Sequence, residues 1–536
     1  MKNTFSIILL AVLLAACTST ALPSATPPPS TPTATLQTIQ PAWWKEAVFY
    51  EIFVRSFNDS NGDGIGDFNG ITEKLDYLQN LGIDALWLMP IQPSPSYHGY
   101  DVINYFNVNP QYGTMADFER LLAEVHRRGM HLIIDLVLNH TSSQSPWFIN
   151  ANNNPQSPYR NWYLWSDTTP ATNGSDWRAG LHGYYFGIFS QDMPDLNYTN
   201  PDVTAGMEKV VRFWLTNVGV DGFRLDAVKD LIEEGSKIEN TVSTHTWLKG
   251  FYQDYKAINP QAFTVGEAYG ADASLAKTYT GNQVDEVFEF ELASGFVNSA
   301  LGGATSGVNS ALTFMLQDMP DGQFATFLTN HDQNRVMSTL NGNIDQAKLA
   351  AALMLTAPGT PFIYYGEEIG MQGEKPDEDI RRPMQWSADS NAGFTSGTPW
   401  RAPAADYAQV NVATESNDPN SLWSFYQTMI ALRHAHSALR DGTLSLVSSG
   451  NPGVYAILRS DGKETLLVLI NLTKSAIGAY HLSLQNPGLT DGQYSLDLLY
   501  GGGSPAPLVV ANQAFSNFKP LVELPAYGIS IFNLKP

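Results

Sequence analysis

The stretch GVDGFRLDAVKD, from Gly219 to Asp230, decides the fold. It opens as an apolar run, which predicts a buried strand, and then places Arg224 and Asp226 two residues apart, on one face of that strand. Buried charges are costly unless they are paired, so a cation and a carboxylate here indicate a strand end with a chemical role. The rest of the chain must supply the sheet around it.

Apolar runs of this kind recur from residue 47 to residue 370 and alternate with amphipathic segments. The eight runs span residues 47–57, 84–90, 131–140, 219–228, 262–269, 285–292, 324–331 and 361–370. The segments between them, such as 71–82, 115–129 and 203–219, have apolar residues at helical spacing and end on Gly. Eight buried strands that alternate with helices predict an α/β fold, a closed (β/α)8 TIM barrel formed by residues 41–140 and 201–440.

Two regions depart from this repeat. Residues 141–200 are rich in Asn, Ser, Pro and Trp and are too long for a loop between a strand and a helix, so they predict an inserted domain after the third strand, called domain B below. Residues 441–536 alternate apolar and polar positions between Gly and Asn turns and lack a helical pattern. They predict a C-terminal antiparallel β-sandwich, called domain C below.

The first residues predict export. Lys2 precedes an apolar stretch too short to span a bilayer as a stable helix, and the stretch ends in Leu14-Ala15-Ala16-Cys17. This ending resembles a bacterial lipobox, so residues 1–17 are expected to be a lipoprotein signal peptide with Cys17 lipidated; the alternative is an ordinary signal peptide with an incidental cysteine. Residues 18–40, rich in Thr, Ser and Pro, are expected to be an extended tether. We therefore expect a protein anchored by lipid at the bacterial cell surface or envelope.

Composition limits the partners. The 30 basic and 52 acidic residues give a net charge of −22, which repels nucleic acids and anionic lipids. We expect no nucleic-acid partner, membrane contact only through the N-terminal lipid, and a monomer. Cys17 is the only cysteine, so no internal disulfide can form. Aromatic residues reach 12%, which suits carbohydrate binding or a large aromatic core equally well.

Polar residues gather at the C-terminal ends of the predicted strands, where active sites of such barrels are built. Glycosidic cleavage needs one protonated and one ionised carboxyl group. Arg224 would hold Asp226 charged and oriented, as a nucleophile requires, whereas Glu267 has no cation beside it in sequence, so its pKa can rise toward that of a general acid. The alternative for each residue is an ion pair that closes the barrel mouth. The whole group argues against that: Asp226, Glu267, Asp332, Arg224, His140 and His331.

Several motifs, including DLVLNH, GFRLDAVKD, VGEA, FLTNHD, MPDLN and HGYDVINYFNVNPQYGT, resemble the signature regions of the α-amylase family of glycoside hydrolases. The resemblance covers residue 43 to the end of the chain. It implies that Asp226 is the nucleophile, Glu267 the acid/base and Asp332 the third carboxylate that steadies the distorted sugar. The substrate-binding residues implied are Tyr97, His98, Tyr100, Asp101, His140, Arg224, Lys229 and His331.

The segment DSNGDGIGD, residues 59–67, predicts a calcium loop, because oxygen ligands alternate with glycines. The expected ligands are Asp59, Asn61, Asp63, the Ile65 carbonyl and Asp67. It is not an EF-hand, since Gly70 stands where the bidentate Glu would be; the alternative is a turn cluster without metal. The same loop binds calcium in several members of the family. A second Ca²⁺ site formed by Asn139 and Asp195 is a further expectation.

The resemblance does not by itself decide between cleavage within the glucan and cleavage at its end. MPDLN resembles a group between the oligo-1,6-glucosidase and neopullulanase branches, which includes lipoprotein α-amylases, whereas DEDIRRPMQW resembles oligosaccharide glucosidases and trehalose synthases. Exo-acting glucosidases usually carry Asp where this chain has Tyr97, and Lys229 matches a lysine of α-amylases. We therefore expect endo-acting, retaining hydrolysis of α-1,4 bonds in starch and maltooligosaccharides. The alternatives are an exo-acting α-glucosidase, oligo-1,6-glucosidase or transglycosylating relative, an inactive surface glucan-binding protein, and a purely structural surface protein.

Overall fold

The computed structural model describes residues 42–171, 173–319 and 322–536. The predicted signal peptide, Cys17 and the tether lie outside the described residues. Within the described ranges, no helix is both long and apolar enough to cross a membrane.

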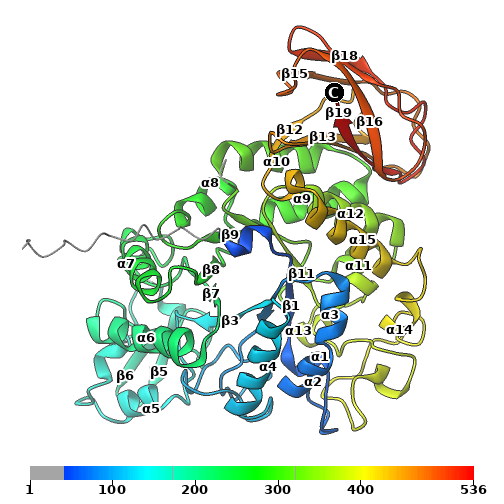
Figure 1. The fold of residues 1–536 in the computed structure, drawn as a ribbon. Helices are drawn as coiled ribbons and strands as arrows, with labels where there is room; N and C mark the ends of the chain where they lie inside the picture. Colours follow the sequence, from blue (N-terminus) through cyan, green and yellow to red (C-terminus); the bar gives the residue numbers. More distant parts are fainter. Residues whose placement is uncertain (1–41, 172, 320–321) are drawn as a thin grey trace, which may run out of the picture. The chain divides into compact units, whose positions relative to one another are not determined.

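Eight parallel strands close into a barrel in the order β1-β11-β10-β9-β8-β7-β3-β2, which confirms the predicted TIM barrel (Figure 1). Seven of the eight predicted runs contain one of these strands, and the eighth, 361–370, overlaps β11, which begins one residue earlier. Their bounds are β1 Phe49–Ile52, β2 Ala85–Leu88, β3 His131–Val137, β7 Gly222–Asp226, β8 Phe263–Gly266, β9 Glu286–Phe288, β10 Phe324–Thr326 and β11 Thr360–Tyr364. The strand of the opening stretch, β7, lies between β3 and β8. Its Gly222 allows β8 to approach, because a Cβ there would lie 1.9 Å from the Phe263 carbonyl oxygen.

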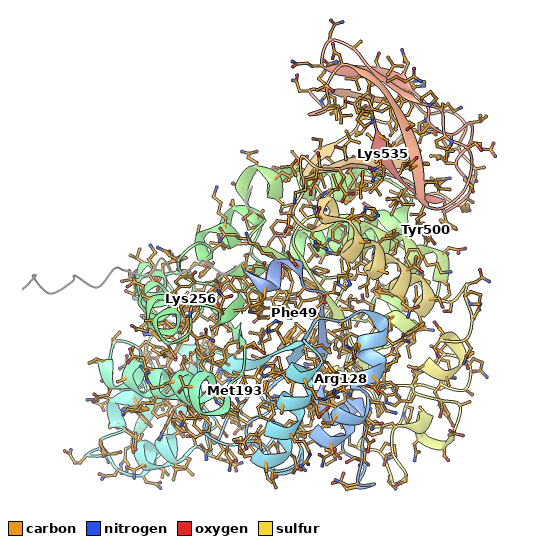
Figure 2. All side chains as sticks on the ribbon, viewed as in Figure 1. Phe49, Arg128, Met193, Lys256, Tyr500 and Lys535 are labelled. Carbon is orange, nitrogen blue, oxygen red and sulfur yellow. The ribbon has the colours of Figure 1, made fainter. Side chains whose placement is uncertain are left out.

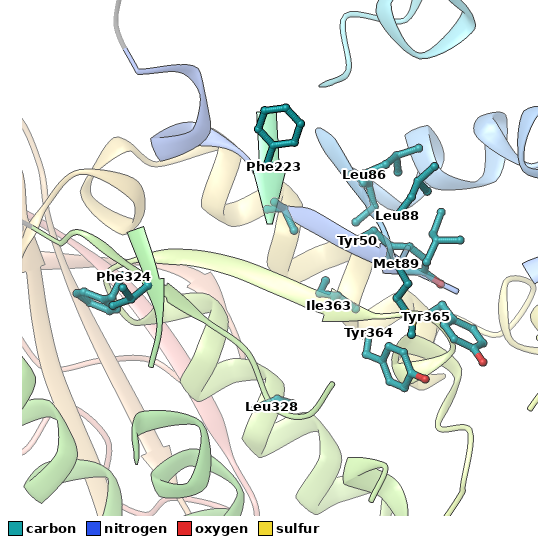
Figure 3. Close-up of a cluster of buried hydrophobic side chains, with 14 of the residues drawn as sticks. Tyr50, Leu86, Leu88, Met89, Phe223, Phe324, Leu328, Ile363, Tyr364 and Tyr365 are labelled. Atoms are coloured by element: carbon teal, nitrogen blue, oxygen red, sulfur yellow. The ribbon is translucent and has the colours of Figure 1, made fainter. Parts of the chain in front are cut away.

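Successive side chains of each barrel strand point outward and inward in turn, so the strands contribute to two apolar cores. Side chains facing outward pack under the surrounding helices, and Figure 3 shows members of that layer such as Tyr50, Leu86 and Ile363. Side chains facing inward at the strand starts are mostly aromatic. Phe49 and Phe362 stack with centroids 4.3 Å apart. The lower barrel interior is therefore a packed plug, which leaves the C-terminal ends of the strands for polar residues.

Helices cover the barrel, and two predicted strands end earlier than expected. The runs 47–57 and 285–292 turn into the helices α1 and α9 after β1 and β9. The helices of the barrel are α1 Val54–Phe57, α2 Phe68–Glu73, α3 Leu75–Leu81, α4 Met115–Arg127, α6 Pro201–Arg212, α7 Val242–Ile258, α8 Ala273–Ala276, α9 Phe290–Gly302, α10 Ser306–Asp318, α11 Val336–Thr339, α12 Ile344–Thr356, α13 Asp377–Ile380, α14 Val412–Glu415, α15 Leu422–Ala435 and α16 Ser437–Arg440. A π-helical segment, Phe213–Val218, continues α6.

The inserted segment after β3 has its own small sheet. It contains α5 Pro146–Asn153 and the three-stranded sheet β4-β6-β5, with bounds β4 Trp165–Ser166, β5 Trp177–Gly180 and β6 Gly183–Phe186. Its last residues return to the barrel, since the Leu196 amide donates to the Asn139 carbonyl at 2.8 Å. The end of domain B is thereby fixed beside the end of β3.

The C-terminal antiparallel domain is confirmed as well. A six-stranded sheet, β12-β13-β14-β19-β16-β17, faces the two-stranded sheet β15-β18 across an apolar core of its own. The bounds are β12 Thr443–Leu446, β13 Val454–Ser460, β14 Thr465–Asn471, β15 Leu482–Gln485, β16 Gly492–Tyr500, β17 Leu508–Val510, β18 Ala514–Phe518 and β19 Ile529–Lys535. The buried Arg459 side chain of β13 donates to the Thr356 carbonyl of α12 at 2.6 Å and so joins this domain to the barrel helices.

Candidate active site

Charged residues replace the aromatic plug toward the C-terminal ends of the strands. Two positions beyond Phe49, β1 carries Glu51, and β3 carries Asp135. Asp135 is paired in register with Arg224 of β7. All three are at most 2% exposed. The inward face of the barrel is thus apolar at its base and ionic at its mouth.

The Arg224 guanidinium joins three carboxylates, a group called the Arg224 cluster below. Nη1 donates to Asp226 Oδ1 at 2.6 Å and to Asp135 Oδ1 at 3.0 Å. Nη2 lies 3.0 Å from Glu267 Oε2. One guanidinium therefore holds both predicted catalytic carboxylates, which fixes their separation and orientation. The predicted pairing of Arg224 with Asp226 is present in the structure.

Glu267 also binds Arg224, which its sequence neighbours did not suggest. Burial raises the pKa of Glu267, and the negative charges of Asp226 and Asp332 add to this rise, whereas Arg224 opposes it. The pKa therefore moves in the predicted direction, but its main cause is burial. The Ala227 amide donates to Glu267 Oε2 at 3.1 Å from a backbone with φ of 48°, a left-handed conformation that is uncommon for alanine. The residue after Asp226 is thus strained at the site itself.

Asp332 lies between two cations. Arg381 Nη2 donates to Asp332 Oδ1 at 2.8 Å, and His331 Nε2 lies 3.2 Å from Asp332 Oδ2. Burial raises the pKa of Asp332, but His331 and Arg381 outweigh it and hold that pKa well below its usual range. Burial lowers the pKa of His331, but Asp332 and Glu51 outweigh it and raise that pKa to about 9. His331 is therefore a buried cation at neutral pH.

Tyr100 connects the two groups. Its hydroxyl donates to Asp135 Oδ2 at 3.1 Å and lies 2.6 Å from His331 Nε2. His140 lies nearby, with Nε2 3.2 Å from the Tyr100 carbonyl, and burial lowers its pKa. The residues that the sequence assigned to the cleaved sugar are therefore brought together from the ends of β3, β7, β8 and β10.

Two adjoining cavities of about 430 and 330 Å³ form a cleft over these residues. Asp226, Glu267 and Asp332 line it together with His98, Tyr100, His140 and Lys229. Phe189 and Met193 of the inserted segment also line it, and Met193 is labelled in Figure 2. The cleft is therefore shared by the barrel and domain B, and its size suits a small number of sugar rings.

Three predicted substrate-binding residues have other immediate partners. Tyr97 does not line either cavity: its ring stacks on Trp400 at 5.4 Å, and its hydroxyl lies 3.5 Å from Arg381 Nη1. The buried Asp101 carboxylate accepts hydrogen bonds from two serine hydroxyls of its own loop. Lys229 lines the cleft, and its ammonium group pairs with Glu239. Tyr97 thus borders the cleft through Arg381.

The structure adds residues that the sequence analysis did not assign. Asp135 and Glu51 each interrupt an apolar strand with one charge, and that interruption was a usable signal. Burial raises the pKa of Asp135 to about 7. Arg381 and Asp377 also line the cleft and lie 3.1 Å apart, but they stand at the two ends of the four-residue helix α13, which is too short to give a periodic signal.

The loop 59–67 satisfies its acids through its own backbone. Asp59 accepts hydrogen bonds from three backbone amides of the loop, those of residues 61, 62 and 64, and Asp67 caps α2 by accepting from the Gly70 amide at 2.7 Å. The Ile65 carbonyl has no donor among the described residues, and the carboxylate of Asp63 is exposed. Oxygen atoms are the ligands that calcium prefers, but no group of three or more His, Cys, Asp or Glu side chains in the described ranges is arranged to hold a metal.

The second predicted calcium site lies where domain B returns to the barrel. Asp195 is 1% exposed, and its Oδ2 has no hydrogen-bond partner in the part of the chain that the structure describes. Burial raises its pKa well above the usual range, with further rises from Glu233 and Asp230. Burial raises the pKa of each of those two acids to about 7. The Asn139 amide donates to the Asp230 carbonyl, and Asp195 forms a β-bridge with the neighbouring His140, so Asn139 and Asp195 lie beside the same buried acids.

At the C-terminal mouth of this closed parallel barrel, the pKa of Glu267 is raised and that of Asp332 is lowered, so one carboxyl group can be protonated while another is ionised, as glycoside hydrolysis requires. The family model "Alpha amylase, catalytic domain" matches residues 51–442. "Alpha-amylase 3" of Dictyoglomus thermophilum is 42% identical over 81% of this chain and 86% of that protein. "Oligo-1,6-glucosidase" of Parageobacillus thermoglucosidasius is 34% identical over 81% and 91%. The crystal structure of α-amylase from H. orenii superposes with a TM-score of 0.80 and 35% identity over 92% of this chain and 100% of that one. The chain belongs to the α-amylase family of glycoside hydrolases.

Proposed function

We propose that this enzyme cleaves internal α-1,4 bonds of starch and maltooligosaccharides with retention of anomeric configuration. The observation that carries the proposal is the Arg224 cluster, in which one guanidinium binds both Asp226 and Glu267. A shared cation keeps the two carboxyl groups close, and retaining hydrolysis needs them about 5–5.5 Å apart, whereas inversion needs room for a water between them.

The proposed mechanism divides the work between two carboxyl groups. Asp226 attacks the anomeric carbon and forms a glycosyl ester, while Glu267 donates its proton to the departing glycosidic oxygen. The raised pKa of Glu267 supports its role as the acid. Deprotonated Glu267 then takes a proton from the water that opens the ester, which restores both groups. Asp332 and His331 hold the sugar at the cleavage point.

Internal cleavage is supported by the position of Tyr97. An Asp there is the residue by which exo-acting relatives grip the end of a chain, and here a tyrosine lies against Arg381 instead. Without that carboxylate, one end of the cleft lacks the group that would stop the glucan chain. The position of Lys229 in the cleft lining supports a further sugar contact beyond the bond that is cut.

The test is a product profile from soluble starch, resolved over time. An endo-acting enzyme lowers viscosity and iodine staining before much reducing sugar appears, and NMR shows α-anomers released first. Glucose as the only early product would favour the second candidate, an exo-acting glucosidase, which the likeness to an oligo-1,6-glucosidase keeps open. Early β-anomers would contradict the retaining mechanism.

We also propose calcium at the loop 59–67, held by Asp59, Asn61, Asp63, the Ile65 carbonyl and Asp67. Two features support it: the Ile65 carbonyl accepts no hydrogen bond from the described residues, and the Asp63 carboxylate is exposed. The ion would brace the loop after β1 and take no part in bond cleavage. For Asn139 and Asp195 we propose a second cation, which would relieve the repulsion among the buried acids there.

For the N-terminus we propose export and a lipid anchor on Cys17, at the bacterial surface or envelope. The lipobox-like residues and the tether composition support this proposal. Mass spectrometry of the mature chain tests it: a diacylated N-terminal Cys17 is expected, and an unmodified chain that begins elsewhere would contradict it.

A further inference from the structure

A second hollow lies away from the catalytic cleft. A cavity of about 580 Å³ opens between domain C and the barrel helices α12 and α15. Tyr500 ends β16 there, where domain C meets those helices (Figure 2), and Tyr527 precedes β19 on the same cavity. The volume is in the range of about 300–1,000 Å³ that is typical of small-ligand sites. None of its lining residues lines the catalytic cleft.

The two tyrosines offer both a ring and a free hydroxyl. Each lines the cavity and is half-buried, and neither hydroxyl forms a hydrogen bond with any described residue. By contrast, the hydroxyls of Tyr480 and Tyr494 in the same domain bind protein partners at 2.7 and 2.9 Å. The Tyr500 ring is supported from below by the buried Phe425, with centroids 5.8 Å apart and planes at 78°. These are the features of an apolar platform with a polar tip.

The backbone at Tyr527 adopts an uncommon conformation. Its φ is 54°, a left-handed conformation that a bulky residue rarely adopts. The buried Asn471 amide fixes this turn by donating to the Pro525 carbonyl at 2.7 Å. A tyrosine retained in strained backbone at a cavity rim points to use of its side chain.

Charge decides the chemical class of the ligand. Asp345 and Lys348 of α12 supply one charge of each sign to the lining, so the cavity favours a neutral ligand with hydroxyl groups over an anion or a cation. We propose that this cavity is a second α-glucan-binding site, in which Tyr500 and Tyr527 stack on glucose rings of a chain. The inference rests on the proposed function for the identity of the glucan, and it adds a place where starch is held without being cut.

The test uses the full chain with Glu267→Gln, so that the ligand survives, and β-cyclodextrin, a closed ring of α-1,4-linked glucose, as the probe. Isothermal titration should detect a binding site that Tyr500→Ala with Tyr527→Ala weakens about tenfold, since truncating a buried aromatic anchor has effects of this size. Adsorption to granular starch should fall similarly. Phe314→Ala, which removes an exposed aromatic ring of α10 outside this cavity, is the control and should change neither.

Activity on short and on granular substrates distinguishes the proposed second site from the catalytic cleft. With Glu267 intact, the double variant should keep the kcat/KM of the parent on maltotriose and lose rate on granular starch. If the double variant is unstable, Tyr527→Gly removes the ring while accepting the left-handed backbone, and must still weaken adsorption. Unchanged binding in these variants, or a concentration-dependent dimer that they abolish, overturns the inference. Cyclodextrin binding that depends on Tyr500 in a chain that cuts no starch would refute the proposed function alone.

Discussion

Two regions of the molecule gather carboxylates, and they satisfy them in opposite ways. In the Arg224 cluster, side chains neutralise one another inside the barrel, and the pKa of Glu267 is raised by burial. In the loop 59–67, backbone amides do this work, with Asp59 alone accepting from three of them. A carboxylate whose pKa depends on neighbouring side chains can gain or lose a proton during a reaction. A carboxylate that accepts hydrogen bonds from backbone amides instead fixes the conformation of the loop.

The largest effect on activity is expected from substitutions of the two catalytic carboxylates of the Arg224 cluster. Asp226→Ala and Glu267→Gln should each lower kcat on soluble starch by about 10⁴-fold or more, because a nucleophile or a general acid is lost. Both variants should unfold within a few degrees of the parent, as circular dichroism would show. Asp67→Asn, a change in the loop, is the control and should leave kcat nearly intact. Retention of more than a hundredth of the activity in either catalytic variant would contradict the assignment.

His331 is a charge that depends on neighbouring side chains, so its contribution to the stability of the folded protein should depend on pH. Its pKa in the folded protein is about 9, above the usual value of 6.5, so its contribution is fully present below pH 6.5 and is lost as pH rises through 9. His331→Gln should therefore destabilise the protein by about 3 kcal/mol at low pH and by much less near pH 10. Thermal unfolding across that range measures the difference.

His140 supplies the matched control for this pH dependence. Burial lowers its pKa, so its contribution has the opposite sign and is lost as pH falls. The stability difference between the parent and His140→Gln should therefore shrink toward low pH. A His331 variant whose loss does not shrink toward high pH would mean that His331 is neutral in the folded protein.

Variants of the loop 59–67 can distinguish the effect of calcium binding from the effect of the carboxylate hydrogen bonds to backbone amides. Asp63 is exposed and its carboxylate accepts one backbone hydrogen bond, from the Ile65 amide at 2.8 Å, so Asp63→Ala should lower the melting temperature mainly by removing calcium, an effect of about 1–2 kcal/mol, and chelator should then change nothing further. Asp59→Ala should cost a similar or larger amount in chelator too, because it leaves backbone amides unpaired. If chelator does not affect the parent and elemental analysis finds no metal, the loop is a turn without calcium.

How far the sequence predicts this structure depends on the kind of signal. The spacing of apolar residues and the buried apolar runs predicted the barrel and domain C. Both predictions follow from a local pattern that recurs in each strand. The carboxylates at strand ends were equally visible, since parallel strands bring their ends to one rim. Contacts between different strands were not visible in the sequence. Glu267 had no cation near it in sequence because Arg224 lies 43 positions earlier, and only the closure of the barrel brings the two side chains together.

Irregular segments limited the prediction for the same reason. Arg381 has no periodic neighbours, yet it pairs with Asp332 and contacts Tyr97. The sequence placed Tyr97 against a sugar from its position beside Tyr100, but its ring is engaged by Trp400, which comes from a distant loop. Side chains on regular strands were therefore located well, and partners contributed by loops were not.

The smallest expected effect concerns Tyr97. Tyr97→Ala should raise KM for long maltodextrins a few-fold and leave maltotriose nearly unchanged, because the ring supports Arg381 at the border of the cleft and touches none of the reacting groups. Tyr97→Phe keeps the ring on Trp400 and should behave as the parent. Tyr97→Asp is the sharper variant: a carboxylate facing Arg381 would form a charged pair that binds the end of a chain, so small products should appear earlier from starch. Equal KM changes for long and short substrates in Tyr97→Ala would mean that this residue only shapes the loop, and internal cleavage would then be supported by the product profile alone.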